Sequence, residues 1–199
     1  MRSRLSILLL AVVVGLAAAA SASAGPKILV TTKTYPVAGD DGAALVKAMD
    51  RTGPRQGFMT RAIAQTSYTV DWDLQVARTK DACRLARAEP TLHVNYIFPR
   101  ADNLPPALAK RWKRFMAGVR KHEKTHGRIA AEMVRAAARS VSGLTYAQDP
   151  ACDRTRREAW RRIDAIYAKY EARQVAFDGR EHAAGGQVEK LVDTLTAGD

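Results

Sequence analysis

Two histidines and a glutamate within five residues are the part of this sequence best suited to chemistry. His122 and His126 stand four positions apart in His122-Glu-Lys-Thr-His126, inside a stretch with helical periodicity. On a helix, side chains at i and i+4 lie on one face a turn apart, so both imidazoles can reach one metal ion. Zinc accepts neutral imidazole nitrogens, and Glu123, about 100° further round the helix, can accept a proton from water. The spacing therefore predicts a zinc site with Glu123 as general base.

The alternative is a pair of solvated histidines on a basic helix, with Glu123 offsetting the charge of Lys124. The helix face that carries the two histidines is otherwise apolar, with Phe115, Val119, Ile129 and Met133. Ring nitrogens on a buried face need polar partners, which favours the metal site.

A catalytic zinc site needs a third protein ligand, and two residues are candidates. If two long helices pair antiparallel through a turn near residues 143–149, equal rises place Thr125 opposite residues 168–170. Glu171 then lies abreast of the histidines. His182 follows the end of the second helix, and a short return of the chain would bring it to the metal.

The elements that must position these residues are predicted from periodicity and from helix and turn signals. The expected strands are residues 27–35, 66–74 and 92–98, and the expected helices are 43–49, 106–142 and 149–178. Asp149-Pro150 is expected to cap and open the last helix. We expect an α+β fold: a small antiparallel sheet packed with a long antiparallel helical hairpin, the first helix carrying H-E-x-x-H. The last 15 residues or so are expected to be loosely held.

The first 24 residues have the pattern of a secretory signal peptide. Arg2 and Arg4 precede an apolar run over residues 7–20, and Ala22-Ser-Ala24 follows it. The run is shorter than the roughly 20 residues that span a bilayer. The prediction is a signal peptide at 1–24 and a single zincin-like metallopeptidase-type domain at 25–199, periplasmic or secreted, with no transmembrane segment after cleavage.

The chain has two cysteines, Cys83 and Cys152. They are too few and too far apart in sequence for a thiolate metal site. In an oxidising compartment we expect them to form a disulfide.

Charge is the most conspicuous feature of the composition. The 199 residues contain 32 Lys and Arg against 20 Asp and Glu, a formal charge of +12. Loss of the signal would leave +10, and residues 110–139 alone carry +8, from ten basic and two acidic side chains. Export and the lack of a nucleic-acid-binding motif argue against a nucleic-acid partner. A solvated helix face, or attraction to anionic envelope surfaces, is the expected role of this charge.

From Tyr35 to about His182 the chain resembles a bacterial family of unknown function, described as predicted secreted zinc-dependent proteases. The features that carry the resemblance are Tyr35-Pro-Val-Ala-Gly39, Gly53-Pro54, the strand over 66–72, Cys83, Trp112, Phe115, His122-Glu-Lys-Thr-His126 and Cys152-Asp153. The resemblance implies an α+β fold, an exported location and metallopeptidase activity.

The closing helix of that family ends in Tyr-Asp-x-x-Thr-x-His-Gly, whose histidine would be the third zinc ligand. Phe177-Asp178-Gly-Arg-Glu-His182 is one residue shorter, lacks the threonine and is followed by Ala183. Alternatively, Tyr170-Glu-Ala-Arg173 matches the start of the motif, with extra residues before His182. His182 is the preferred third ligand, and Glu171 remains open.

The function expected from the sequence is an exported zinc-dependent hydrolase that cleaves peptide or protein substrates in the cell envelope. Tyr167, Tyr170 or Arg180 is expected to steady the oxyanion, from position alone. The alternative is a catalytically inactive exported binding module that keeps the fold and binds polyanions or envelope surfaces through its basic helix.

Overall fold

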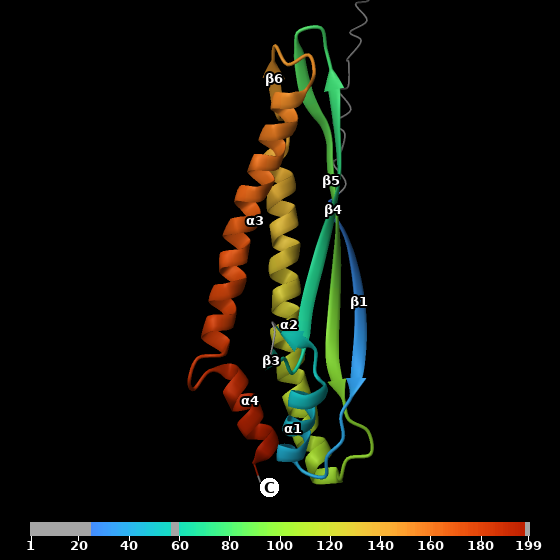
Figure 1. Ribbon diagram of the computed structural model, residues 1–199, viewed down its shortest axis with the longest axis vertical. Coiled ribbons are helices and arrows are strands. Elements are labelled where there is room, and N and C mark those ends of the chain that lie inside the picture. The colour runs from blue at the N-terminus through green and yellow to red at the C-terminus, as the bar shows by residue number, and fades with distance from the viewer. Residues whose placement is uncertain (1–24, 57–59, 198–199) are drawn as a thin grey trace, which may run out of the picture.

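A long β-hairpin and a long helical hairpin run side by side along the molecule (Figure 1). The computed structural model describes residues 25–56 and 60–197, so the predicted signal peptide lies outside the described residues. Strands β4 (Gln65–Arg78) and β5 (Ala82–Arg100) form the β-hairpin, and helices α2 (Pro106–Val141) and α3 (Asp153–Glu181) form the helical one. This arrangement confirms the expected α+β class and the helical hairpin.

The main sheet is mixed rather than antiparallel throughout. Its order is β1-β5-β4, and β6 (Thr145–Ala147) pairs antiparallel with the first residues of β5. Strand β1 (Lys27–Pro36) runs parallel to β5. Helix α1 (Gly42–Thr52) and β4 lie between β1 and β5 in the chain, and a connection of that length permits a parallel crossover. Two short strands, β2 (Arg55–Gln56) and β3 (Thr60–Arg61), pair separately.

One face of the sheet packs on the helices. Along β5 the alternate residues Leu92, Val94, Tyr96 and Phe98 are buried against α2, as period-two alternation requires. His93 points to the other face, where its Nε2 lies 3.1 Å from a carboxylate oxygen of Asp71. His93 therefore lies on the face of the sheet away from the metal motif.

The register of α2 against α3 differs from the one expected, in which an equal rise per residue in both helices placed Thr125 opposite residues 168–170. Helix α3 begins at Asp153, and the Asp149 carboxylate accepts hydrogen bonds from the backbone N–H groups of Arg154 and Thr155, at 3.3 and 2.9 Å. Asp149 thus caps the helix from upstream instead of opening it. After α2 the chain continues through β6 and a further segment before α3 begins. As a result, Arg162 of α3 lies level with Ser140 of α2 and donates a hydrogen bond to its backbone carbonyl, at 3.0 Å. Residues later in α3 therefore face the metal motif.

A disulfide joins Cys83, at the start of β5, to Cys152, the residue before α3. The pairing predicted from the two cysteines is confirmed. It ties the far ends of the two hairpins together, at the end of the molecule opposite α1 and α4 (Figure 1).

The C-terminal segment is ordered, contrary to the expectation of a loose tail. Residues Gln187–Thr196 form helix α4, which packs on α1 and α2. Its Leu195 is fully buried, and the Leu195 carbonyl accepts a hydrogen bond from the guanidinium of Arg111, at 2.9 Å. An apolar face of only a few residues is enough to dock so short a helix.

Within residues 25–56 and 60–197, every helix is too short or too polar to cross a membrane.

Candidate metal centre

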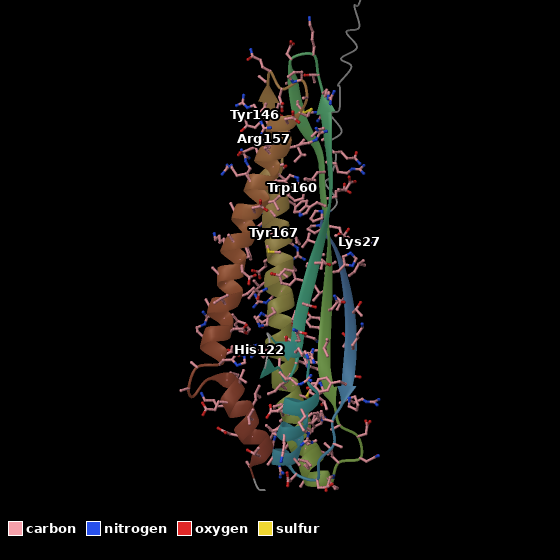
Figure 2. The ribbon with its side chains drawn as sticks, viewed as in Figure 1. Lys27, His122, Tyr146, Arg157, Trp160 and Tyr167 are labelled. Atoms are coloured by element: carbon pink, nitrogen blue, oxygen red, sulfur yellow. A yellow bond between two sulfur atoms is a disulfide. The ribbon has the colours of Figure 1, made fainter. Side chains whose placement is uncertain are left out.

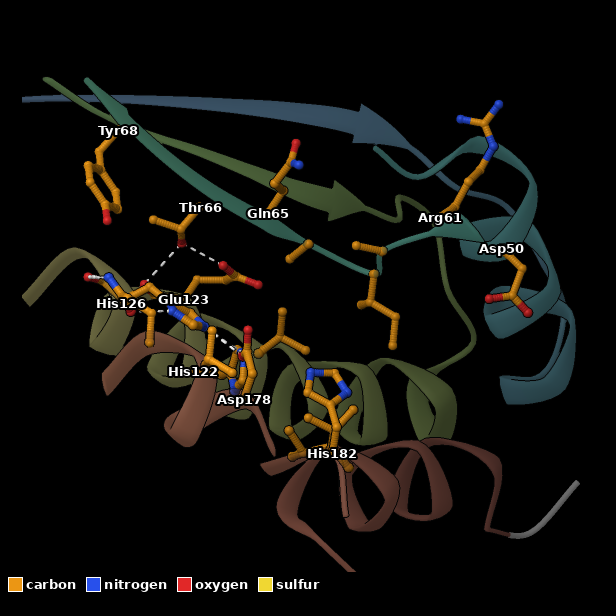
Figure 3. A pocket seen from close by; sticks show the side chains of 18 of the residues that line it. Asp50, Arg61, Gln65, Thr66, Tyr68, His122, Glu123, His126, Asp178 and His182 are labelled. Atoms are coloured by element: carbon orange, nitrogen blue, oxygen red, sulfur yellow. Dashed lines mark hydrogen bonds and ion pairs between the residues drawn. The ribbon is translucent and has the colours of Figure 1, made fainter. Parts of the chain in front are cut away.

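The H-E-x-x-H residues lie midway along α2, facing the last turns of α3 (Figure 2). His122 and His126 point from α2 toward Asp178, in the last turn of α3, and His182 follows as the residue that ends the helix (Figure 3). The helix predicted for the motif is thereby confirmed. Glu123 points toward β4, about 100° round the helix from His122, and lines the same cleft as the two histidines.

Three donor atoms form a small triangle at this position. The Nε2 atoms of His122 and His126 are 3.3 Å apart. Oδ1 of Asp178 lies 2.9 Å from the His126 nitrogen and 3.3 Å from the His122 nitrogen. The two imidazoles are almost enclosed, with side-chain exposures of 10% and 13%. Three such atoms gathered at one point in a nearly buried setting form a group that could hold a metal ion.

Gln174 fixes the tautomer of His126. The side-chain amide of Gln174 donates to the His126 backbone carbonyl, at 3.1 Å, which turns its oxygen toward His126 Nδ1, at 2.6 Å. An amide oxygen only accepts, so Nδ1 carries the proton and the lone pair of the neutral ring lies at Nε2. Gln174 is itself buried. This is the hydrogen bond that a metal-binding histidine makes with its other ring nitrogen.

His122 has a different environment. Its Nδ1 is buried and has no hydrogen-bond partner within the described part of the chain, and a carboxylate oxygen of Glu181 is 3.5 Å away. The ring of Phe177 packs against both imidazoles, with centroids 4.9 and 5.0 Å away. An apolar ring on one side holds the two histidines in place and keeps water from that side.

His182 lies close to the same donors. One ligand atom each of His122, Asp178 and His182 lies within 4.8 Å of the others, and the rings of His122 and His182 meet edge to face with centroids 5.5 Å apart. His182 is exposed, whereas His122 is not. The structure therefore brings three of the predicted residues, His122, His126 and His182, into one neighbourhood.

Asp178 is the site residue that sequence reasoning missed. It stands four residues before His182, so a helix continuing to that point would have placed the two on one face. Glu171, the other candidate ligand, precedes Asp178 by about two helical turns, and its carboxylate is 3.5 Å from the hydroxyl of Tyr68. The different register of the hairpin explains why Asp178 and not Glu171 meets the histidines.

Glu123 is buried and held by β4. The hydroxyl of Thr66 lies 2.5 Å from a carboxylate oxygen of Glu123 and 3.0 Å from its backbone carbonyl. Tyr96, opposite Thr66 in the sheet, lies close by: burial raises the pKa of its hydroxyl, and the negative charge of Glu123 raises it further. Glu123 therefore has a fixed position beside the donor triangle.

A cleft of about 520 Å³ contains the motif. Tyr68 lines it near the donor residues, and Asp50 and Arg61 line its far end (Figure 3). Glu171, 3.5 Å from the Tyr68 hydroxyl, and Gln174, which contacts His126, also line it. Burial, followed by the neighbouring Glu171 carboxylate, raises the pKa of Tyr68, so its hydroxyl stays protonated at neutral pH. A volume of this size is typical of a small-ligand or peptide site.

The three residues expected at the oxyanion lie outside this lining. Tyr167 accepts a hydrogen bond from the indole of Trp72, at 2.8 Å, and Tyr170 packs under the guanidinium of Arg173. Arg180 is exposed on the last turn of α3. Tyr68 is the phenol that lines the cleft.

Fold and site together define an α+β protein whose helical hairpin and sheet enclose a cleft. An H-E-x-x-H motif on α2 faces Asp178 and His182 in this cleft. The chain belongs to the family described as bacterial protein of unknown function (DUF922), whose model matches residues 32–186. The match covers the motif, Asp178 and His182 and ends before α4. Neither a comparison with curated proteins nor one with solved structures finds a match. The family identity inferred from the sequence is thus confirmed.

Proposed function

We propose that this protein is a zinc-dependent hydrolase that cleaves peptide bonds, with Glu123 as its general base. The observation that carries the proposal is the donor triangle of His122, His126 and Asp178 beside a buried, positioned glutamate in one cleft. In metallopeptidases, an H-E-x-x-H helix supplies two metal ligands and a general base from five consecutive residues.

The spacing of the donors fits zinc. Zinc binds nitrogen and oxygen at about 2.0–2.1 Å, so neighbouring donors in a tetrahedral set lie roughly 3.3 Å apart. The three observed separations, 3.3, 3.3 and 2.9 Å, are close to that value. Two imidazoles and a carboxylate oxygen are ligands that zinc accepts, whereas calcium and magnesium prefer oxygen alone.

The proposed ligand set is His122, His126 and Asp178, with His182 flanking it on the exposed side. Three protein ligands leave the fourth position open, which a catalytic zinc site requires. Four protein ligands would close it, as in structural zinc sites.

The chemistry is hydrolysis of an amide. Zinc in such a donor set supplies a Lewis acid that polarises the scissile carbonyl and lowers the pKa of water. Glu123 accepts one proton from the attacking water, whose oxygen bonds to the carbonyl carbon. When the C–N bond breaks, Glu123 returns that proton to the amine nitrogen, so a carboxylic acid and an amine are released and Glu123 is regenerated. Thr66 holds the carboxylate in the direction this transfer needs.

We also propose that the protein works outside the cytoplasm, on peptides or proteins of the cell envelope. The Cys83–Cys152 disulfide supports this location, because disulfides persist in oxidising compartments. The basic residues of α2 are exposed except for Arg111, and an anionic envelope surface is their proposed partner.

The test is zinc content and peptide hydrolysis of the mature protein, compared with Glu123→Gln. We expect tightly held zinc in both proteins and a loss of roughly 10²–10⁴-fold in hydrolysis rate in the variant. Glu89→Gln, an exposed change on β5, is the matched control and should leave both properties unchanged. Undiminished hydrolysis by zinc-loaded Glu123→Gln would exclude the role of Glu123. A mature protein without tightly held zinc would favour the alternative of an inactive binding module.

A further inference from the structure

The cleft continues past the donor residues into a section with apolar walls. These walls come from three parts of the fold: the segment leading into β4, α2 and α4. The side chains are Ala62, Ile63, Ala64, Val119, Val188 and Leu191. Ile63, Val188 and Leu191 are only partly buried although they are aliphatic, so the section offers apolar surface that the described residues leave uncovered.

Helix α4 forms this wall rigidly. Its far end is fixed by the buried Leu195, which lies so close to α1 that a Cβ at Gly42 would meet the Leu195 carbonyl oxygen at 2.3 Å. On the cleft side, Leu191 packs directly over Gly118 of α2, where a Cβ would come within 2.2 Å of its methyl carbon. At the start of α4, the Glu189 carboxylate accepts a hydrogen bond from the backbone N–H of Gly185, at 2.6 Å. The wall is therefore part of the packed structure.

The sections of the cleft on the two sides of the donor residues differ in chemistry. Beyond the donor residues on one side are the hydroxyl of Tyr68, the amide of Gln174 and the carboxylate of Glu171. On the other side lies the aliphatic section, and Asp50 and Arg61 line the end of the cleft beyond it (Figure 3). A peptide bound along the cleft would thus have the residue on one side of the cleaved bond in polar surroundings and the residue on the other side in apolar surroundings.

We propose that the section between Ile63 and α4 is a specificity pocket, which binds an aliphatic or aromatic side chain of the peptide next to the bond that is cleaved. This inference rests on the proposed function, because it takes the donor residues as the place of reaction. An apolar pocket discriminates between side chains that differ by a single methylene by roughly 10–200-fold in rate. The family match ends at residue 186, so Val188 and Leu191 stand outside the part of the chain that the family relationship describes.

The experiment compares peptides that differ at one position, with Leu, Ala or Asp beside the cleaved bond. The zinc-loaded wild type is expected to prefer Leu over Ala by at least about 10-fold and to reject Asp. Val188→Phe fills the pocket and should reverse the preference in favour of Ala. Lys190→Ala, on the exposed side of the same helix, is the matched control and should keep the preference for Leu. A thermal melt of each variant checks that the fold is retained.

Binding of the same peptides to zinc-loaded Glu123→Gln, by fluorescence anisotropy, separates this inference from the proposed function. If the zinc-loaded wild type cleaves none of the peptides, the hydrolase proposal fails. The pocket still stands if Leu peptides bind best to Glu123→Gln and Val188→Phe, added to that variant, removes the binding preference. If peptides are cleaved without regard to the neighbouring side chain, or Val188→Phe leaves the preference unchanged, the pocket is refuted and the hydrolase proposal stands.

Discussion

Nε2 of His126 lies 2.9 Å from Oδ1 of Asp178, although 52 residues separate them in the chain. The same carboxylate oxygen is 3.3 Å from Nε2 of His122. With the proton of His126 on Nδ1, facing Gln174, the nitrogen that faces Asp178 presents a lone pair to an anionic oxygen. A cation between them would relieve that repulsion, which makes Asp178 the central residue of the predicted metal centre.

Asp178→Asn is therefore expected to weaken zinc binding by at least about 100-fold, because it removes the negative charge while keeping the size of the side chain. His182→Ala is expected to cost less than 10-fold, since His182 is exposed and flanks the triangle. Competition with a chromophoric zinc chelator at neutral pH measures both, and Asp164→Asn, exposed on the same helix, is the control. A larger effect of His182→Ala than of Asp178→Asn would favour His182, as predicted from the sequence, as the third ligand.

Gln174 is predicted to tune the metal site without touching the metal. Gln174→Ala removes the acceptor at Nδ1 of His126 and should reduce zinc affinity by roughly 10–100-fold, whereas Gln174→Glu retains an acceptor and should lose less. The same chelator competition checks both. Gln187→Ala, exposed at the start of α4, serves as the comparison. Equal zinc affinity in wild type and Gln174→Ala would show that the tautomer of His126 is not set by Gln174.

Thr66 is predicted to be a positioning residue for Glu123. Thr66→Val removes the hydroxyl that lies 2.5 Å from the carboxylate but keeps the shape of the side chain. A hydrogen bond to a charged group contributes about 1.5–3 kcal/mol, so the loss should lower kcat by about 10-fold or more while zinc affinity stays the same. Thr66→Ser should restore the rate, and Thr69→Val, exposed on the same strand, should have no effect. Wild-type kcat in Thr66→Val would contradict this role.

Periodicity was sufficient to predict most of the fold. The H-E-x-x-H helix, the strands that became β4 and β5 and the disulfide all follow from local patterns or from two cysteines in one chain. The parallel pairing of β1 does not, because hydrophobic alternation identifies a strand but not the direction of its neighbour. Helix α4 was missed although Val188, Leu191 and Leu195 recur at helical spacing, because a helix of ten residues is stable only when such a face is buried, as Leu195 is.

The site illustrates the same limit. His122, Glu123 and His126 are set by the spacing of one helix, and the sequence identified them. The residue opposite them depends on the register of α2 against α3, which the hydrogen bond from Arg162 to Ser140 fixes. A displacement of about two helical turns exchanges Glu171 for Asp178. Local spacing cannot determine that register, because it depends on where β6 and the Asp149 cap let α3 begin.

The disulfide is predicted to contribute substantially to stability. It closes a loop with a sequence separation of 69 residues, for which the chain-entropy model gives a stabilisation of about 4 kcal/mol. The double variant Cys83→Ser, Cys152→Ser should show that loss in urea unfolding monitored by circular dichroism. Wild type treated with reductant should match the variant. An identical urea midpoint with and without reductant would show that the constraint on the unfolded chain is negligible.

Glu158 is predicted to make stability depend on pH at the disulfide end of the molecule. Hydrogen bonds from Arg161 and then Arg162 lower the pKa of this carboxyl from 4.5 to about 2. As the pH falls, Glu158 is protonated near pH 4.5 in the unfolded chain but stays ionised to about pH 2 in the folded protein. The contribution of Glu158 to folding stability is therefore complete above about pH 4.5 and is lost as the pH falls to about 2. The difference in Tm between wild type and Glu158→Gln should be constant from about pH 7 to pH 5 and should shrink below that. Because Arg161 is exposed, about 1 M salt should reduce the difference at every pH, and a difference that is the same at low and at neutral pH would contradict the ion pairs as its cause.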